Sequence, residues 1–122
     1  MHGLDPSIVP HLLTIARATT ESLAFIFLDE AGAAMGVHHI PSTAISSIDV
    51  PLRTAVAVAM AHESRRVVMA HNHPSGDPEP SPEDLRTTRR VAGALDTLGI
   101  RLVDHLVLAG DASVSFRARG LL

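Results

Sequence analysis

The sequence predicts an α/β fold with a mixed β-sheet flanked by helices, because strand-like and helix-like segments alternate along the chain. Residues 23–28 form an almost continuous apolar run, and a second run over residues 35–40 follows a short polar turn, so the two predict a β-hairpin. Residues 82–98 repeat apolar side chains at helical spacing after Ser81, which is a favoured N-cap residue. A sheet that contains this hairpin and is covered by helices satisfies all three patterns.

The remaining elements follow from the same criteria. We expect a helix over residues 7–18, a helix over residues 51–62, a strand over residues 67–70, a strand over residues 100–109 and a returning strand over residues 114–116. Residues 41–47 are predicted to be irregular. A chain of 122 residues suits one domain, so residues 1–122 are interpreted as a single unit in which residues 1–20 form an N-terminal helical extension.

Composition excludes several classes of protein. Hydrophobic residues make up 46% of the chain, enough for a core without disulfides, and there is no cysteine, so any bound metal must be held by nitrogen and oxygen. The ten basic residues are all arginines and face 13 acidic ones, a balance that argues against nonspecific nucleic-acid binding. No signal peptide or membrane-spanning run is visible, which predicts a cytoplasmic protein without membrane contact; a monomer and a homodimer are both compatible with the sequence.

The most unusual chemistry follows the predicted strand over residues 67–70. His71 and His73 are two positions apart, so their rings point the same way if the strand continues through them. Asp84, at the start of the next predicted helix, can add a carboxylate if the loop folds back. Two imidazoles and one carboxylate are a typical open Zn²⁺ site, in which the fourth position is left for a water molecule. The sequence therefore predicts zinc as the cofactor.

Ser81 lies one helical turn before Asp84, where its hydroxyl or nearby backbone N–H groups could stabilise a developing oxyanion. Each part of this pattern also has a purely structural interpretation. Ser-x-x-Asp at a helix start is a capping arrangement, and His-x-His in a loop is often only polar surface. The combination of both within one short, Pro-rich loop favours the metal site.

The residues quoted above resemble a known family. His71-Asn72-His73-Pro74 followed by Ser81-x-x-Asp84 is similar to the motif of JAMM (MPN+) metalloproteases, and the string HNHPSGDPEPSPED resembles their RadC branch. The resemblance implies an MPN fold related to cytidine deaminases, a zinc ion on His71, His73 and Asp84, and hydrolysis of a peptide or isopeptide bond. The helix-hairpin-helix segment of RadC proteins is absent from this sequence, which weakens a role as a DNA-repair accessory.

The general base is the point at which the sequence departs from the pattern. The resemblance implies a Glu on the second strand, but the corresponding position before His71 holds His38-His39, and no Glu occurs between Glu30 and Glu63. His39, or His38, could act as the base, since an imidazole accepts a proton near neutral pH. Either could instead occupy the fourth zinc position and make the metal structural, or simply be solvated.

Two further positions remain open. Asp104 and His105 interrupt an apolar strand, so Asp104 could accept the free N–H of a ligand histidine or could make a structural hydrogen bond. Arg53 matches an Arg of the RadC pattern but could also be a solvated helix residue. The leading hypothesis is a zinc-dependent hydrolase acting on a peptide or protein substrate, and the alternative is a catalytically impaired MPN-like binding module with a structural or vestigial zinc.

Overall fold

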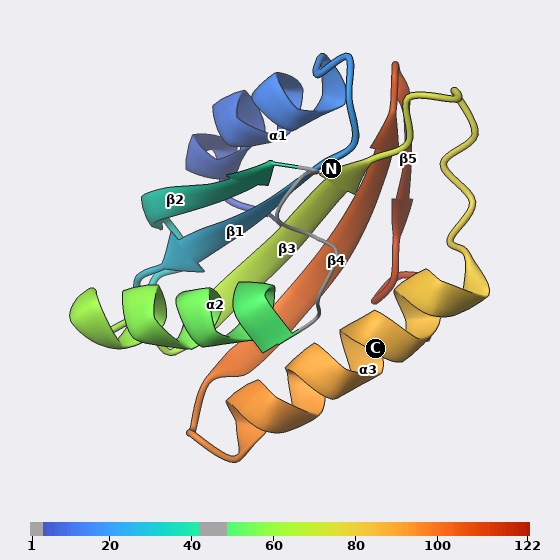
Figure 1. Cartoon of the computed structure of the whole chain (residues 1–122). Coiled ribbons are helices and arrows are strands. Elements are labelled where there is room, and N and C mark those ends of the chain that lie inside the picture. The colour runs from blue at the N-terminus through green and yellow to red at the C-terminus, as the bar shows by residue number, and fades with distance from the viewer. Residues whose placement is uncertain (1–3, 42–48) are drawn as a thin grey trace.

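A five-stranded sheet forms the centre of the protein, whose computed structural model describes residues 4–41 and 49–122 (Figure 1). Its strands lie in the order β2-β1-β3-β4-β5. The strands are β1 (Ser22–Leu28), β2 (Ala34–Pro41), β3 (Arg66–Asn72), β4 (Arg101–Ala109) and β5 (Ala112–Ser115). The β3–β4 pair is parallel and the other three pairs are antiparallel, so the predicted α/β fold with a mixed sheet is confirmed.

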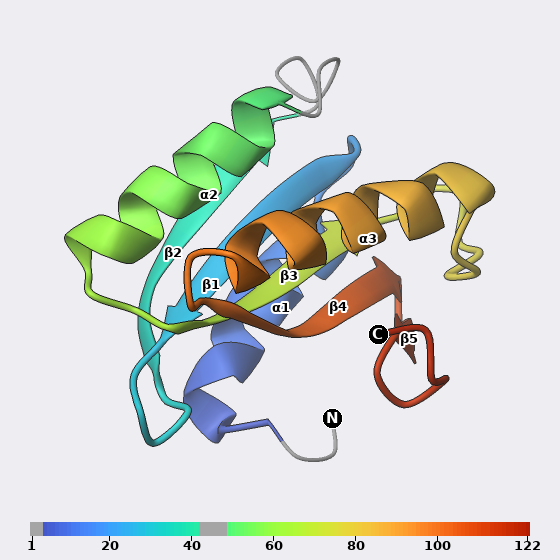
Figure 2. The same cartoon turned by 90° about the horizontal axis from the view of Figure 1, so that it is seen from below.

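Helices cover both faces of the sheet. They are η1 (Pro6–Ile8), α1 (Val9–Ala16), α2 (Asp49–Ala61) and α3 (Pro82–Asp96). Helix α1 packs on one face, and α2 and α3 lie side by side on the other (Figure 2). None of the helices in the described ranges is long and apolar enough to cross a membrane.

Alternation along the strands supplies a core on each face. Phe25, Phe27 and Met69 point towards α2 and α3 and are fully buried. Ala24 and Ile26, which alternate with the two phenylalanines on β1, pack against α1 instead. This alternation decides which side chains of β3 can reach α3.

The predicted elements agree with the structure except at their ends. Strand β3 continues to Asn72 rather than ending at residue 70, because its ladder with β4 runs on to Leu108. The helix expected over residues 7–18 begins as the 3₁₀ turn η1, with Asp5 as its N-cap. The segment predicted to be irregular, residues 41–47, lies outside the described residues apart from Pro41, which ends β2.

The topology brings three segments to one edge of the sheet. Because β3 and β4 are parallel, α3 crosses between them and begins near the edge where both strands end. Because β1 runs antiparallel to β3, the start of β1 lies beside the end of β3, with Leu23 opposite His71. Side chains from before β1, from the end of β3 and from the start of α3 therefore meet there.

Candidate metal centre

His71 is the last residue but one of β3, the strand that lies between β1 and β4. It is paired with Leu23 on one side and Val107 on the other, and it is only 6% exposed. Its ring lies on the α3 face of the sheet, the face to which Leu23 also points. Burial lowers the pKa of His71 to about 4, although the nearby Asp84 carboxylate opposes this shift. The ring is therefore neutral near pH 7, the form that binds a metal.

His73 lies just beyond β3, where its backbone N–H continues the pairing with Leu108. Its Nδ1 atom is 2.8 Å from the carbonyl oxygen of Asp77. A carbonyl can only accept, so Nδ1 of His73 carries the proton and Nε2 presents a lone pair. A turn in the loop brings the Asp77 carbonyl to this ring: Gly76, at a φ of 94°, donates its N–H to the carbonyl of His73.

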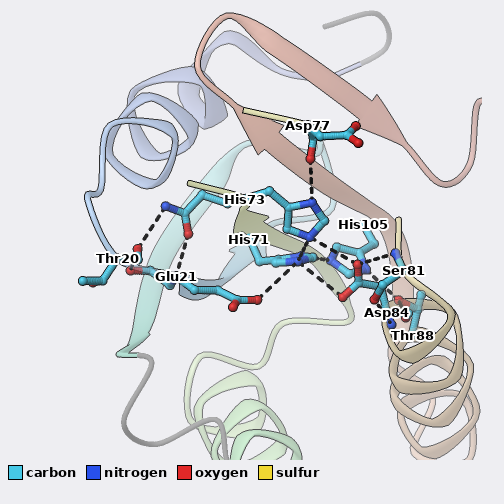
Figure 3. A network of polar contacts seen from close by, with 11 residues as sticks. Thr20, Glu21, His71, His73, Asp77, Ser81, Asp84, Thr88 and His105 are labelled. Carbon is cyan, nitrogen blue, oxygen red and sulfur yellow. Dashed lines mark hydrogen bonds and ion pairs between the residues drawn. The ribbon is translucent and has the colours of Figure 1, made fainter. Parts of the chain in front are cut away.

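Asp84 extends from the first turn of α3 towards both histidines (Figure 3). Its Oδ1 lies 3.4 Å from Nε2 of His71, and its Oδ2 lies 3.3 Å from Nε2 of His73. Partial burial alone would raise the pKa of Asp84, but the hydrogen bond from the Ser81 N–H and the histidines lower it overall. The carboxylate is thus charged and faces two ring nitrogens.

Ser81 forms the N-cap of α3. Its Oγ accepts from the Asp84 N–H at 3.0 Å, and its own N–H donates to Asp84 Oδ2 at 2.8 Å, which together make a capping box. The capping interpretation of Ser-x-x-Asp is therefore confirmed. Because the bond from Asp84 uses an acceptor lone pair of Ser81, the hydroxyl hydrogen is left to donate elsewhere.

Glu21 is a member of this cluster that the sequence interpretation missed. It precedes β1, and its Oε1 lies 3.9 Å from Nε2 of His71. Ligand atoms of Glu21, His71 and His73 all lie within 4.8 Å of one another. In Figure 3, Glu21 and Asp84 approach His71 from opposite sides. With a side chain that is 57% exposed, against 16% for Asp84, Glu21 is the carboxylate open to solvent.

His38 and His39 are not brought to this cluster. His39 is paired with Ala24, a residue of the α1 face, so its side chain points away from the face that carries the ring of His71. His38 is opposite Phe25 on β2, two strands away from β3. Among the described contacts at the cluster, none involves either histidine. The structure therefore does not bring His39 to the cluster, and the glutamate that lies there is Glu21, on the segment before β1.

Of the two roles left open for Asp104, the structure supports the structural hydrogen bond. Asp104 accepts hydrogen bonds from the backbone N–H groups of His105 and Arg117 and from the Ser115 hydroxyl, so its contacts are structural. It is His105 that contacts the cluster, with its Nε2 atom 2.9 Å from Nδ1 of His71. Burial lowers the pKa of His105 to about 3. Arg53 lies exposed on α2.

The donor set fits a tetrahedral cation. Two ligands that bind one zinc ion at 2.0–2.1 Å lie roughly 3.3 Å apart. Each ring nitrogen has an Asp84 oxygen at about this spacing, Oδ1 at 3.4 Å from His71 and Oδ2 at 3.3 Å from His73. The two Nε2 atoms of His71 and His73 are 2.9 Å apart, so the rings need to separate by only a few tenths of an ångström. Charged oxygens and neutral imidazoles are also the ligand types that zinc accepts.

Comparison with known proteins identifies the family. A family model described as the RadC-like JAB domain matches residues 6–121, so the chain belongs to this family. Its mixed sheet with flanking helices is the fold of JAB/MPN domains. The chain is 38% identical over 102 residues to a UPF0758 protein of Xanthomonas axonopodis pv. citri, covering 84% of the chain and 45% of that relative.

Two other relatives give the same picture. A UPF0758 protein of Xylella fastidiosa is 39% identical over 102 residues, which is 84% of this chain and 46% of the relative. A UPF0758 protein of Cellvibrio japonicus is 40% identical over 119 residues, which is 93% of this chain and 53% of the relative. The chain thus spans about half the length of the relatives it matches, and their names state no activity.

Proposed function

We propose that the protein is a zinc-dependent hydrolase that cleaves a peptide or isopeptide bond. The observation that carries the proposal is the position of Glu21, whose Oε1 lies 3.9 Å from Nε2 of His71 on the side opposite Asp84. A cluster of His71, His73 and Asp84 alone would suit a structural metal as well as a catalytic one. A second, solvent-accessible carboxylate beside it supplies what hydrolysis needs in addition, a base.

His71, His73 and Asp84 are the residues that would hold the ion. Asp84 is preferred to Glu21 as the third ligand because it is closer to His71, with contacts of 3.4 and 3.9 Å respectively, and less exposed. Each of its oxygens also faces a different histidine. When bound, zinc would supply a water molecule whose pKa it lowers to about 7.

The chain's own residues divide the remaining work. Glu21 accepts the proton of the attacking water and, because it is more than half exposed, can turn to deliver that proton to the departing amine. The Ser81 hydroxyl donates to the oxygen of the scissile carbonyl as negative charge develops there. The Ser81 cap aligns this hydroxyl with the first turn of α3, the same turn that carries Asp84.

The test separates metal binding from turnover with one isosteric change. Zinc content is measured on the purified protein, and hydrolysis is assayed with a quenched-fluorescence peptide library and with a peptide linked through a lysine ε-amine. Glu21→Gln is expected to keep one zinc per chain and to lose about 10²–10⁴-fold in rate. Glu79→Gln, a change of the same kind on an exposed loop residue, is the control and should leave the rate unchanged.

Three outcomes count against the proposal. Wild-type protein that binds no zinc refutes the metal site, and a Glu21→Gln variant as active as the wild type refutes the base. Zinc retained by a wild-type protein that hydrolyses neither probe favours the non-catalytic binding module over the enzyme.

A further inference from the structure

A chain of hydrogen bonds runs from His71 through the core back to the start of α3. Nδ1 of His71 lies 2.9 Å from Nε2 of His105, and Nδ1 of His105 lies 2.6 Å from Oγ1 of Thr88. Oγ1 of Thr88 lies 2.7 Å from the backbone carbonyl oxygen of Asp84. The residues His71, His105 and Thr88 are 6%, 2% and 0% exposed, so water does not compete for these contacts. In Figure 3, His105 lies beside the His71 ring on the side that faces α3, the helix that carries Thr88.

The direction of each hydrogen bond follows from the last acceptor in this series, the carbonyl oxygen of Asp84. The Asp84 carbonyl has no hydrogen, so the single hydroxyl hydrogen of Thr88 must be donated to it. Thr88 can then only accept from His105, which places the His105 proton on Nδ1. The buried His105 ring, stacked on Phe116 with centroids 4.5 Å apart, is a neutral imidazole with one N–H group. Its Nε2 therefore accepts, and Nδ1 of His71 donates.

We infer that Thr88 and His105 form a positioning relay that fixes His71 in the tautomer with its proton on Nδ1 and its lone pair on Nε2. The backbone carbonyl of Asp84 is the fixed end of this relay. Asp84 therefore acts twice, once through its carboxylate towards the metal position and once through its main chain on the ring of His71. Neither Thr88 nor His105 touches the metal position, so both act through His71.

As a consequence of this relay, the Nε2 lone pairs of His71 and His73 face each other. Asp77 already fixes the proton of His73 on Nδ1, and the relay does the same for His71, so both Nε2 atoms are bare while lying 2.9 Å apart. Two such nitrogens beside a carboxylate repel one another, and a cation between them removes the repulsion. The relay thus preorganises the site for a cation. This consequence rests on the proposed metal function, but the tautomer itself does not.

The tautomer can be measured without any metal. Long-range ¹H–¹⁵N correlation spectra of the chelator-treated full chain at pH 7.5 distinguish a proton on Nδ1 from one on Nε2 for each histidine ring. We expect His71 and His105 in wild-type protein to carry the proton on Nδ1. Thr88→Val removes the hydroxyl at similar volume, so Nδ1 of His105 loses its acceptor and the His105 proton can move to Nε2. Nε2 of His105 then donates to Nδ1 of His71, and the His71 proton is expected on Nε2. Thr88→Ser keeps the hydroxyl and should restore the wild-type spectrum.

Zinc affinity supplies an independent readout by competition with a chromophoric chelator. Thr88→Val is expected to bind zinc about 10–100-fold more weakly than wild type, and Thr88→Ser close to wild type. A wild-type His71 with its proton on Nε2, or a Thr88→Val variant with unchanged His71 tautomer, overturns the relay. If wild-type protein shows the expected tautomer but binds no zinc, the metal function fails while the relay stands, so the two proposals fail separately. Should Thr88→Val not fold, the wild-type and Thr88→Ser spectra still decide.

Discussion

Asn72 holds Ser22 by a hydrogen bond of 2.6 Å from the Ser22 N–H to its side-chain oxygen. Its amide nitrogen donates to the carbonyl oxygens of Ala18 and Thr20, at 3.0 Å each. Asn72 alternates with His71 on β3 and so points to the other face of the sheet, where it is 1% exposed. It thus secures the segment on which Glu21 lies, and the strand that carries His71 also fixes the position of Glu21.

Replacing Asn72 by Asp should therefore impair Glu21 without touching a metal ligand. The isosteric carboxylate keeps an acceptor for the Ser22 N–H. It has no N–H to donate to the carbonyl oxygens of Ala18 and Thr20, so its second oxygen faces two other oxygens. We therefore expect a loss of about 2–4 kcal/mol in the free energy of unfolding. Displacement of Glu21 should lower hydrolysis by up to about 100-fold with zinc content unchanged. Urea unfolding, metal analysis and the peptide assay measure these effects. Wild-type hydrolysis by the folded variant would contradict this role of Asn72.

Zinc should stabilise the chain through His71, His73 and Asp84. A ligand present at 100 times its dissociation constant adds about 2.7 kcal/mol to the folded state, which corresponds to a rise of roughly 10 °C in Tm for a domain of this size. Calorimetry with and without zinc measures the rise. His73→Ala should abolish it, and His39→Ala, on the other face of the sheet, should leave it intact. Equal rises in both variants would place zinc elsewhere.

The fold was predictable because its patterns are local. The continuous apolar run over residues 23–28 and the capping residue Ser81 were enough to locate β1 and the start of α3. His71 and His73 could be paired because two positions on a strand share a face, and Asp84 because a short loop returns the chain to that face. These relationships span few residues, and the structure brings the three side chains together.

Glu21 could not be located in the same way. Glu21 lies beside His71 only because β1 pairs with β3 as well as with β2, its partner in the hairpin. Without the strand order, a Glu before the first strand has no reason to be placed beside the end of the third. The sequence offered one usable signal, the acidic Glu21 immediately before the first apolar run, whereas the hydrogen bonds by which Asn72 of β3 holds this segment appear only in the structure. Asp104 misled for a similar reason, because its partners come from the C-terminal segment.

Ser81 has two roles that substitutions can separate. Ser81→Ala removes the cap and should cost about 1 kcal/mol, but Ser81→Gly should cost only a few tenths because glycine is tolerated at an N-cap. Both variants lose the hydroxyl that we assign to the oxyanion, so both should lose about 10²–10³-fold in kcat. Thermal unfolding and the peptide assay compare them, with Ser81→Thr as the variant that keeps cap and hydroxyl. If Ser81→Gly retains full kcat, the hydroxyl serves only the helix.

Acidification should destabilise the metal-free protein through His71 and His105. Their pKa values in the folded chain, about 4 and about 3, lie below the ordinary value of 6.5, so between these limits the unfolded chain binds more protons than the folded one. Stability is therefore complete above about pH 6.5 and declines as the pH falls, by up to about 1.4 kcal/mol per pH unit for each histidine. Urea unfolding with chelator at pH 7.0, 6.0 and 5.0 measures this slope. In His105→Phe the new ring can stack on Phe116 as the imidazole does. This variant should reduce the slope of unfolding free energy against pH by up to about 1.4 kcal/mol per pH unit, the contribution of one proton. An unchanged slope in that variant would show that His105 does not contribute to it.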